Sequence, residues 1–361
     1  MTTESTSRTM SAAILYGGKD IRVEERPIPE PYPDEVVVRV RAAGICGSDL
    51  LGYNGIGPWQ PPAGVGIEEG HELAGEIAAV GSAVRGLSVG DRVAVKPEHL
   101  IACGSCRECQ MGMAHLCRRL GLLRGSPHNS HGFSQYDAVV ADQVRRIPDS
   151  ISFDAAAIAD CYGVAVHAVH RAGSVAGQTV AVIGCGAIGL CVGQVARALG
   201  ARRVVMVGDL QDALEVARRT RAADEVVLVG DDPLAFIETL TDGTGAEVVF
   251  EAVGRAATTL DQALRLLARG GKVCVVGVFT SSPVFSPDIA YEKEATLLWS
   301  NSYGFDKGES EFDQTLELMA SGQLDAEGLI TCSFALGEIG EAFATANDKA
   351  RTHAVKVVVH P

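Results

Sequence analysis

The sequence predicts a chain of the α/β plus β class, in which a strand-rich domain is interrupted by a domain built on a doubly wound parallel sheet. Three observations lead to this prediction: a length of 361 residues, a strand-rich first part, and a change to alternating strands and helices near residue 159. One hydrophobic core rarely organises a chain of this length, so we expect two domains.

The first part, residues 1–158, is predicted to be mostly β-strand. Its short segments are rich in β-branched residues, and turns containing Gly and Asp separate them, as in residues 88–91. The clearest predicted strands are 35–41, 73–80 and 92–96. This pattern is typical of a barrel-like β domain.

Residues 159–302 have a different rhythm, in which predicted strands alternate with predicted helices. The strands are expected at 180–183, 204–207, 225–229, 247–250 and 272–276, and the helices at 188–199, 212–221 and 260–268. Gly270 and Gly271 are expected to form the turn before the last of these strands. Strands connected in this way by helices form a parallel sheet.

The tail, residues 303–361, contains one predicted helix, 311–319, and one predicted strand, 355–359. It is too short to form a core of its own. We therefore expect the whole tail to complete the first domain.

Charge and hydropathy exclude several classes of function. The formal net charge is −14 and no segment is rich in Lys or Arg, so the chain lacks the basic surface that nucleic-acid binding requires. Its apolar runs are too short to span a bilayer, and residues 1–10 lack the apolar core of a signal peptide. We expect a soluble, cytoplasmic protein with neither a nucleic-acid nor a membrane partner.

Four of the ten cysteines lie close together within a predicted lobe, residues 98–120. They follow the spacing Cys103-x2-Cys106-x2-Cys109-x7-Cys117. Four thiolates at this spacing can surround one tetrahedral zinc ion, and they leave no coordination position for a substrate. A disulfide cluster is the alternative, but the expected reducing compartment favours metal binding. The sequence therefore predicts a structural zinc site.

A glycine-rich motif stands between the predicted strand 180–183 and the predicted helix 188–199. It reads Gly184-x-Gly186-x-x-Gly189, the pattern of a dinucleotide-binding turn. The first glycine makes the turn, the second admits the pyrophosphate, and the third lets the helix pack on the strand. The positive end of the helix, at Ala187 and Ile188, is expected to bind the phosphates.

Asp209 follows the next predicted strand, near the spacing at which an acidic residue binds the ribose hydroxyls of NAD. A carboxylate there also repels the 2′-phosphate of NADP. Arg202 and Arg203 precede the strand, so they are not expected to bind that phosphate. Asp209 could instead cap the helix that begins near Asp212, and the two roles are compatible. We expect NAD rather than NADP.

A second candidate metal site combines residues far apart in the sequence. Cys46 lies in the segment 44–49 (GICGSD), and His71 lies in the segment 70–75 (GHELAG). One thiolate, one imidazole and nearby carboxylates are suitable zinc ligands. A histidine beside a glutamate is, however, more often structural than a metal ligand.

With these motifs in this order, the chain resembles the zinc-dependent medium-chain dehydrogenase/reductase superfamily, in particular its sorbitol, threonine and butanediol dehydrogenase branch. The resemblance covers nearly the whole chain and also rests on residues 89–93 (VGDRV), 250–254 (FEAVG) and 270–273 (GGKV). It implies a GroES-like catalytic domain, residues 1–158 and 303–361, interrupted by a Rossmann NAD-binding domain, residues 159–302. It also implies a catalytic zinc between the domains and hydride transfer between NAD and a secondary alcohol, a polyol or the corresponding ketone.

The resemblance assigns the ligands of this catalytic zinc. Beside Cys46 and His71, the third ligand is expected to be Asp160, and the next residue, Cys161, is the alternative. Glu72 matches a residue beside the zinc that binds it transiently or supports its ligands.

The resemblance also suggests a proton acceptor. Ser48 matches the hydroxyl that takes the alcohol proton, and otherwise it could cap a turn near Asp49. Related enzymes often have a histidine shortly after this serine, where this chain has Leu50 and Leu51. Tyr53 or water could complete the path to solvent, and the sequence does not decide between them.

Two other functions fit parts of the sequence. A non-catalytic NAD-binding structural or sensor protein could keep the fold, although the complete metal set argues against it. A glutathione-linked formaldehyde dehydrogenase-like enzyme is the second, but that group has a cysteine as third ligand and a longer chain. The resemblance further implies a homodimer or homotetramer in which strand 295–300 pairs between subunits.

Overall fold

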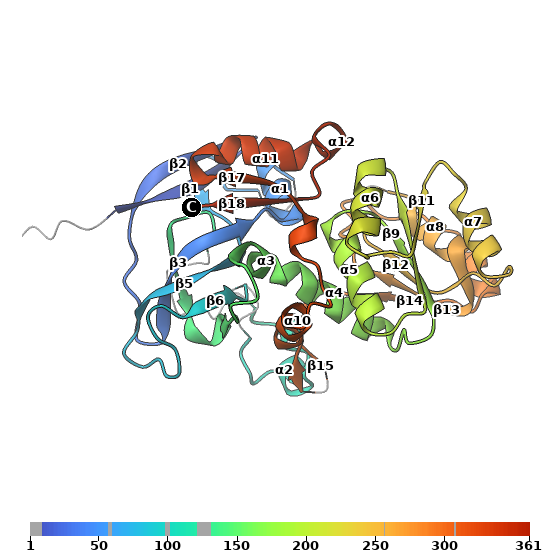
Figure 1. Cartoon of the computed structure of the whole chain (residues 1–361), viewed down its shortest axis with the longest axis horizontal. Helices are drawn as coiled ribbons and strands as arrows, with labels where there is room; N and C mark the ends of the chain where they lie inside the picture. The colour runs from blue at the N-terminus through green and yellow to red at the C-terminus, as the bar shows by residue number, and fades with distance from the viewer. Residues whose placement is uncertain (1–8, 57–59, 98–101, 121–130, 256, 307) are drawn as a thin grey trace, which may run out of the picture. The chain divides into compact units, whose positions relative to one another are not determined.

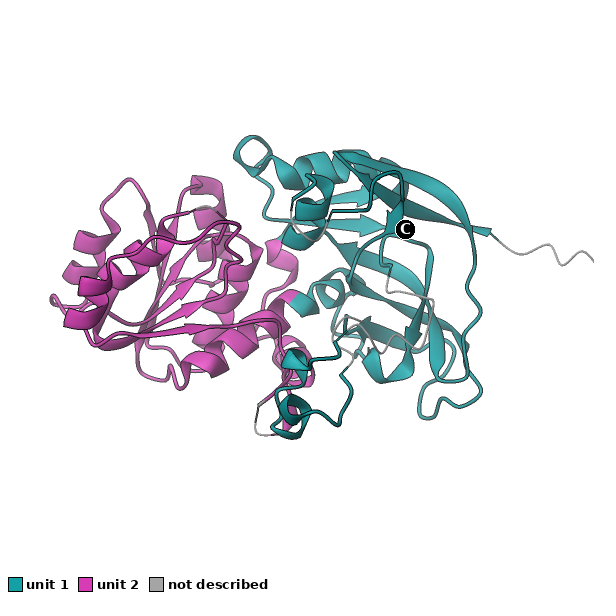
Figure 2. Cartoon of the chain, turned by 180° about the vertical axis from the view of Figure 1, so that it is seen from behind, with its two compact units in different colours: residues 1–160, 330–361 teal, residues 161–329 magenta. Residues whose placement is uncertain are grey.

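The computed structural model describes residues 9–56, 60–97, 102–120, 131–255, 257–306 and 308–361. They form two compact units, coloured separately in Figure 2. Unit 1 extends to residue 160 and resumes at residue 330, and unit 2 comprises residues 161–329. The predicted fold class, a strand-rich domain interrupted by a parallel-sheet domain, is confirmed.

Unit 1 contains two sheets (Figure 1). The smaller has the order β2-β1-β4, and its strands are Thr9–Gly17 (β1), Asp20–Pro27 (β2) and Ile67–Glu68 (β4). The larger has the order β17-β18-β3-β5-β6-β8, with β7 also paired to β3. Its strands are Glu35–Gly44 (β3), Glu72–Val80 (β5), Arg92–Val95 (β6), Tyr136–Val140 (β7), Val144–Arg146 (β8), Ile330–Ala335 (β17) and Lys356–His360 (β18).

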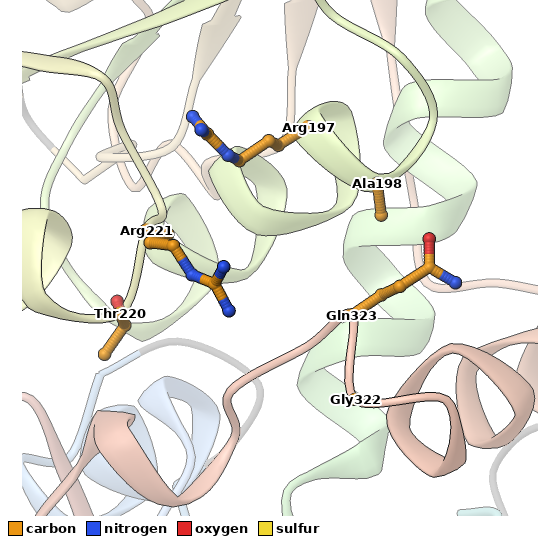
Figure 3. Close-up of a pocket in the computed structure, with 6 residues that line it drawn as sticks. All are labelled: Arg197, Ala198, Thr220, Arg221, Gly322 and Gln323. Carbon is orange, nitrogen blue, oxygen red and sulfur yellow. The ribbon is translucent and has the colours of Figure 1, made fainter.

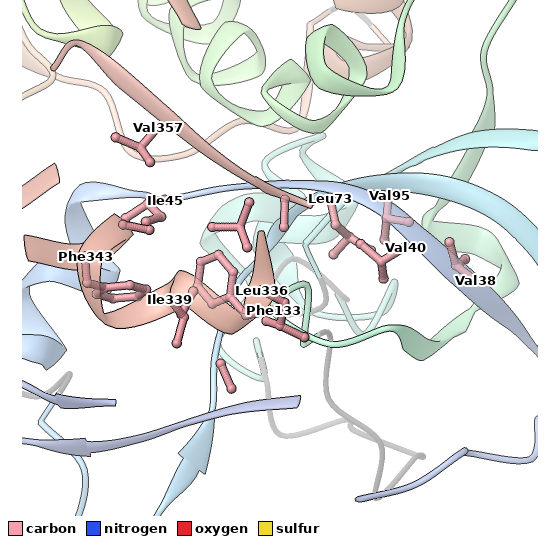
Figure 4. Close-up of a cluster of buried hydrophobic side chains, with 14 of the residues drawn as sticks. Val38, Val40, Ile45, Leu73, Val95, Phe133, Leu336, Ile339, Phe343 and Val357 are labelled. Atoms are coloured by element: carbon pink, nitrogen blue, oxygen red, sulfur yellow. The ribbon is translucent and has the colours of Figure 1, made fainter. Parts of the chain in front are cut away.

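Apolar side chains from both ends of the chain make the core of unit 1 (Figure 4). In β3, Val38 and Val40 point into this core while Arg39 between them is exposed, because successive side chains of a strand point to opposite faces of the sheet. The ring of Phe343, from the C-terminal helix α11 (Ile339–Asn347), packs edge-on against the ring of Phe133, with 5.5 Å between the ring centroids. The C-terminal segment is therefore part of the first core.

The other helices of unit 1 are short: Gly47–Tyr53 (α1), Arg107–Gln110 (α2), Phe153–Ala157 (α3) and Lys349–Thr352 (α12). Helix α4, Ala159–Ala172, begins in unit 1 and continues into unit 2. Single turns of 3-10 helix lie at Ala114–Leu116, Ala141–Gln143, Glu327–Leu329 and Leu336–Glu338. No helix among the described residues is long and apolar enough to cross a membrane.

Unit 2 is built on a six-stranded parallel sheet with the order β11-β10-β9-β12-β13-β14. Its strands are Thr179–Ile183 (β9), Arg203–Gly208 (β10), Glu225–Leu228 (β11), Ala246–Glu251 (β12), Leu267–Val275 (β13) and Thr296–Trp299 (β14). The helices are Ala187–Ala198 (α5), Gln211–Arg219 (α6), Pro233–Leu240 (α7), Thr259–Leu266 (α8), Pro287–Glu292 (α9) and Glu311–Ala320 (α10). A hairpin of Phe305–Asp306 (β15) and Glu309–Ser310 (β16) precedes α10.

This strand order is that of a doubly wound sheet. The first strand, β9, lies in the middle, and the chain fills one side of it with β10 and β11 before it crosses to the other side with β12, β13 and β14. In such sheets the ligand binds outside the carboxyl ends of the strands, where the strand order reverses. Here that place is next to the carboxyl end of β9.

One predicted turn lies inside a strand. Gly270 and Gly271, predicted to precede the last strand, belong to β13. The pairing register shifts around them, because Ala246 pairs with Leu267 whereas Val248 pairs with Lys272. Gly270 has a φ of +73°, which glycine adopts easily. The two glycines therefore lie in an irregular stretch within the strand rather than in a turn between two elements.

The boundary where unit 2 ends differs from the prediction. It lies at 329/330 rather than 302/303, so α10 belongs to unit 2 and only the strands and helices after it complete unit 1. Side chains bind this stretch to α4 and α5: Glu311 is hydrogen-bonded to His167, and the backbone N–H of Asp325 donates to Gln194 (2.7 Å). The helical pattern of residues 311–319 contains no information about which unit the helix packs on. The other boundary, predicted at 158/159, lies at 160/161.

Candidate metal centres and cofactor site

The first candidate metal site lies in unit 1, where β3 ends and β5 begins. Cys46 follows β3 as the N-cap residue of α1, and His71 and Glu72 stand at the start of β5. β3 and β5 are antiparallel neighbours, and Gly44 pairs with Glu72 in their register. Consequently one ligand atom each from Cys46, His71 and Glu72 lies within 4.8 Å of the other two.

Asp49, on α1, connects two of these side chains. One of its carboxylate oxygens accepts a hydrogen bond from the backbone N–H of Cys46 (2.7 Å), and the other lies 3.5 Å from Nδ1 of His71. Asp49 is almost completely buried. A carboxylate beside one ring nitrogen of a histidine leaves the second nitrogen directed toward a metal. Asp49 therefore fixes both the loop that carries Cys46 and the orientation of His71.

Glu72 forms a buried ion pair with Lys356 of β18. Lys356 Nζ also donates to the carbonyl oxygen of Ile45 (3.0 Å), the residue before Cys46. Lys356 is not among the residues that the sequence predicts for this site. In the sequence, Lys356 is recognisable only as a single lysine within the apolar run 355–359 (VKVVV). The pairing of β18 with β3 is what brings this lysine to the site.

Negative charge is concentrated at this site. Burial, together with the charge of Asp49, raises the pKa of Glu69 to about 7. Burial lowers the pKa of His71, but the charges of Cys46 and Asp49 outweigh burial and hold that pKa well above its usual value. The acidic groups of Cys46, Asp49, Glu69 and Glu72 thus surround His71. A thiolate, an imidazole and carboxylates in this arrangement are what a zinc ion binds, so the residues fit a zinc ion.

Asp160, the predicted third ligand, is the second residue of α4 and is buried. Among the described residues, neither its carboxylate nor the thiol of Cys161 joins the closely spaced group formed by Cys46, His71 and Glu72. The structure thus places Glu72, rather than Asp160, in the third position of that group. Glu72 adjoins His71 in the chain and pairs with β3, whereas Asp160 lies on α4, outside the strands of this sheet.

Ser48 lies in the first turn of α1, two residues after Cys46, and is half-buried. The alternative role as a helix cap belongs to other residues, because Cys46 is the N-cap and Asp49 bonds back to it. Tyr53, considered as a further part of a proton path, is a core residue whose ring packs against Phe343 at 5.2 Å.

The second candidate metal site is formed by the four clustered cysteines. One sulfur atom each from Cys103, Cys106, Cys109 and Cys117 lies within 4.8 Å of the other three. Backbone N–H groups point at the sulfurs, as from Cys106 to Cys103 (3.3 Å). Hydrogen bonds, first of all from Ser105, lower the pKa of Cys103 to about 6, which favours the thiolate form that binds metals. The four cysteines fit a closed zinc site. Residues 98–101 of the predicted lobe lie outside the described part of the chain.

The glycine motif of unit 2 forms the turn between β9 and α5. Gly184 has a φ of +109°, and a Cβ on Gly189 would collide with the carbonyl oxygen of Gly184. Gly186 is the N-cap of α5 and faces open space, which lets a ligand approach the backbone. Ala187 and Ile188 begin the helix, as predicted. The turn lies at the carboxyl end of β9, where a doubly wound sheet binds its ligand.

Asp209 directly follows β10, the parallel neighbour of β9, so it lies at the same edge of the sheet as the glycine motif. Its side chain is exposed. The N-cap of α6 is Leu210, so the alternative role of Asp209 as the cap of this helix is not observed. The carboxylate is therefore placed to accept hydrogen bonds from a ligand.

A pocket of about 250 Å³ lies elsewhere in unit 2 (Figure 3). It is lined by Arg197, Ala198, Thr220, Arg221, Gly322 and Gln323, none of which is a predicted site residue. Arg197 is already paired with Asp224. The pocket adds no metal ligand and no part of the glycine motif to either site.

Two family models match the chain, and together they cover most of it. The model described as alcohol dehydrogenase GroES-like domain matches residues 32–149. The model described as zinc-binding dehydrogenase matches residues 187–321.

Individual proteins are similar over the full length. Sorbitol dehydrogenase from Bacillus subtilis is 35% identical over 99% of both chains. The structure of 2R,3R-butanediol dehydrogenase from Bacillus subtilis has a TM-score of 0.82 and 30% identity, covering 98% of this chain and 99% of the other. A zinc-binding dehydrogenase from Sinorhizobium meliloti, bound to NADP, has a TM-score of 0.86 and 31% identity, covering 98% and 100%.

Proposed function

Because the chain belongs to the zinc-binding dehydrogenase family with a GroES-like domain, we propose that it transfers hydride between NAD and a polyol or another secondary alcohol, or the corresponding ketone. The observation that carries this proposal is the convergence of Cys46, His71 and Glu72 in unit 1. The glycine turn of unit 2 supports it with a place for the dinucleotide.

Two zinc ions per chain are proposed. Cys46 and His71 would hold the catalytic ion together with Glu72, which the geometry favours, or with Asp160, which the family pattern favours. The cysteine quartet would hold the second, structural ion. When bound, the catalytic zinc supplies a Lewis acid that polarises the substrate oxygen.

The side chains of unit 1 have distinct tasks in this proposal. Asp49 keeps His71 and the Cys46 loop in place through its two carboxylate oxygens. Ser48, in the first turn of α1, accepts the proton that leaves the substrate hydroxyl. Water then carries this proton onward, because Tyr53 is enclosed in the core.

Unit 2 is proposed to bind the cofactor through its glycine turn. The backbone N–H groups at Ala187 and Ile188 would hold the pyrophosphate, and the Asp209 carboxylate would accept hydrogen bonds from the ribose hydroxyls. This carboxylate favours NAD, although a similar protein binds NADP.

The substrate class follows from the similar proteins. They are named for sorbitol and 2R,3R-butanediol, which both carry hydroxyl groups on secondary carbons. We therefore propose a small polyol or diol as the substrate. The ten cysteines are all free thiols in the structure, which suits the reducing conditions of a cytoplasm.

The proposal is tested by measuring zinc per chain and NAD-dependent oxidation of a panel of polyols and secondary alcohols. The wild type is expected to contain two zinc ions, and His71→Ala to contain one and to lose at least about a hundredfold in activity. Glu72→Gln and Asp160→Asn, compared side by side, identify the third ligand as the one whose loss releases zinc. Glu76→Gln, on the same strand as Glu72, is the matched control.

Two results would contradict the proposal. One zinc ion in the wild type would leave the cysteine quartet as the sole metal site. Two zinc ions without oxidation of any alcohol in the panel would favour the non-catalytic dinucleotide-binding alternative.

A further inference from the structure

Lys356 and Glu72 meet across the middle strand of three. β3 lies between β18 and β5, and Gly44 of β3 pairs with Val358 on one side and with Glu72 on the other. A Cβ at Gly44 would collide with Glu72 Oε2 and lie 3.0 Å from Lys356 Cε. The ion pair therefore occupies the space that a side chain at position 44 would need.

Both members of the pair are enclosed by protein. The side chain of Glu72 is 0% exposed and that of Lys356 is 3% exposed, so neither charge is compensated by solvent. Removing one member of a buried ion pair leaves the other charge without compensation, which is strongly destabilising. The Ile45 carbonyl holds the ammonium group from a second direction at 3.0 Å. Lys356 is thus a fixed positive charge and not a mobile surface lysine.

The same carboxylate belongs to the candidate catalytic metal site. A ligand atom of Glu72 lies within 4.8 Å of ligand atoms of Cys46 and His71. The carboxylate therefore has two cationic partners: the ammonium group of Lys356, and the zinc ion that the site fits. Each partner reduces the electron density that Glu72 can donate to the other.

We propose that Lys356 is a positioning residue that competes with the catalytic zinc for the carboxylate of Glu72. It holds Glu72 in place when no metal is bound, and it weakens the bond from Glu72 to the metal when the site is filled. A weaker donor leaves the metal a stronger Lewis acid, so the competition favours turnover at the expense of metal affinity. This inference rests on the zinc site proposed above.

The test is the rate at which each zinc ion is lost to a chelator, measured on the holoenzyme. Because Lys356 no longer competes for Glu72 in Lys356→Met, release of the catalytic zinc is expected to slow, and alcohol oxidation also slows. The change in the release rate should be about tenfold, the size of effect that neighbours of metal ligands have on metal binding. Release from the cysteine quartet is the internal reference and should not change. Lys19→Met, which removes an exposed lysine of the same unit, should match the wild type in both rates. If Lys356 merely supported the fold, its replacement would instead make the catalytic site release zinc faster.

Unchanged or faster release of the catalytic zinc from Lys356→Met, with normal release from the quartet, would overturn the inference. If Lys356→Met does not fold alone, it should fold when zinc is supplied, because the metal replaces the lysine as the partner of Glu72. Failure to fold with zinc, while the double variant Glu72→Gln/Lys356→Met folds, would also overturn it. A wild type with a single zinc ion would instead refute the proposed function itself.

Discussion

We propose that single charged residues decide which ligands the two sites accept. In unit 1, Asp49 and Glu72 add negative charge next to Cys46 and His71, which suits a divalent cation. In unit 2, Asp209 adds a negative charge beside the glycine turn, which suits the neutral hydroxyls of a ribose and opposes a phosphate. Asp209 therefore allows a direct test of ligand choice in unit 2.

Replacing Asp209 with serine is expected to change the preference between cofactors. The hydroxyl of serine can still bond to a ribose but no longer repels a 2′-phosphate. We expect the ratio of kcat/KM for NAD to that for NADP to fall by about ten- to a hundredfold, the equivalent of one charged hydrogen bond. Steady-state kinetics with both cofactors measures the ratio. Asp212→Ser, an exposed residue on the first turn of α6, is the control and should leave it unchanged. An unaltered ratio in Asp209→Ser would show that another residue makes the choice.

The sequence predicts individual ligands better than it predicts their convergence. Cys46, His71 and the four clustered cysteines are recognisable from motifs, and the structure brings each set together. The third member of the first set depends on the register of β3 and β5, which pairs Gly44 with Glu72. The register between two strands that are distant in the chain is a tertiary property, and the motifs around Cys46 and His71 do not show it. Lys356 was missed for the same reason, since it reaches the site from the last strand.

Elements with strong periodicity are predicted well, and elements with mixed patterns are not. The strands and helices around the glycine motif match their predicted ranges to within a residue or two. β2 was not predicted, because none of its residues is buried and its short alternation of polar and apolar positions, from Asp20 to Glu24, is followed by a run of charged residues. Helix α10 was predicted, but its place in unit 2 was not. That place is set by contacts with α4.

The contact between α10 and α4 centres on one buried carboxylate. Glu311, at the start of α10, is hydrogen-bonded to Nδ1 of His167 (2.9 Å) and to Nδ1 of His170 (3.0 Å), and it accepts a bond from the backbone N–H of Gly304 (2.7 Å). Burial raises the pKa of Glu311, but the bonds with His167 and His170 outweigh burial and lower that pKa to about 2. Glu311 is therefore ionised across the neutral range in the folded protein.

This lowered pKa predicts how stability depends on pH. A glutamate has a pKa of about 4.3 in an unfolded chain, so the unfolded state binds a proton first as the pH falls. The stabilising effect of Glu311 is complete above about pH 4.5 and is lost as the pH falls toward about 2, with an upper value of about 3 kcal/mol. Glu311→Gln is expected to be less stable at pH 7 and to lose less stability between pH 5 and pH 3 than the wild type. Urea unfolding at each pH measures both effects.

The control for this experiment is Glu309→Gln, an exposed glutamate two residues earlier in β16. The free energy of unfolding of Glu309→Gln should match that of the wild type at every pH. If Glu311→Gln has the same acid dependence as the wild type, the carboxylate does not hold α10 to α4 by its charge.

At the scale of the whole molecule, the sheet of unit 2 ends at the edge strand β14. β14 is the last strand of this sheet and pairs with β13 on one side. Trp299 on this strand is 51% exposed, and Tyr291 on α9 just before it is 85% exposed. An edge strand with one exposed aromatic side chain on it and another on the preceding helix can pair with another chain. We propose that two copies of the chain pair through β14, as the family resemblance implies.

Replacing Trp299 with lysine is expected to break this pairing. A charge on an edge strand opposes edge-to-edge association, and because Trp299 is half-exposed, the fold of one copy should tolerate the change. Sedimentation equilibrium should show the wild type as a dimer or a larger even assembly, and Trp299→Lys as a smaller species. Val89→Lys, at an exposed apolar position of unit 1, is the matched control and should assemble like the wild type. A wild type that sediments as a monomer, or a Trp299→Lys variant that keeps its assembly, would show that β14 is not the contact between copies.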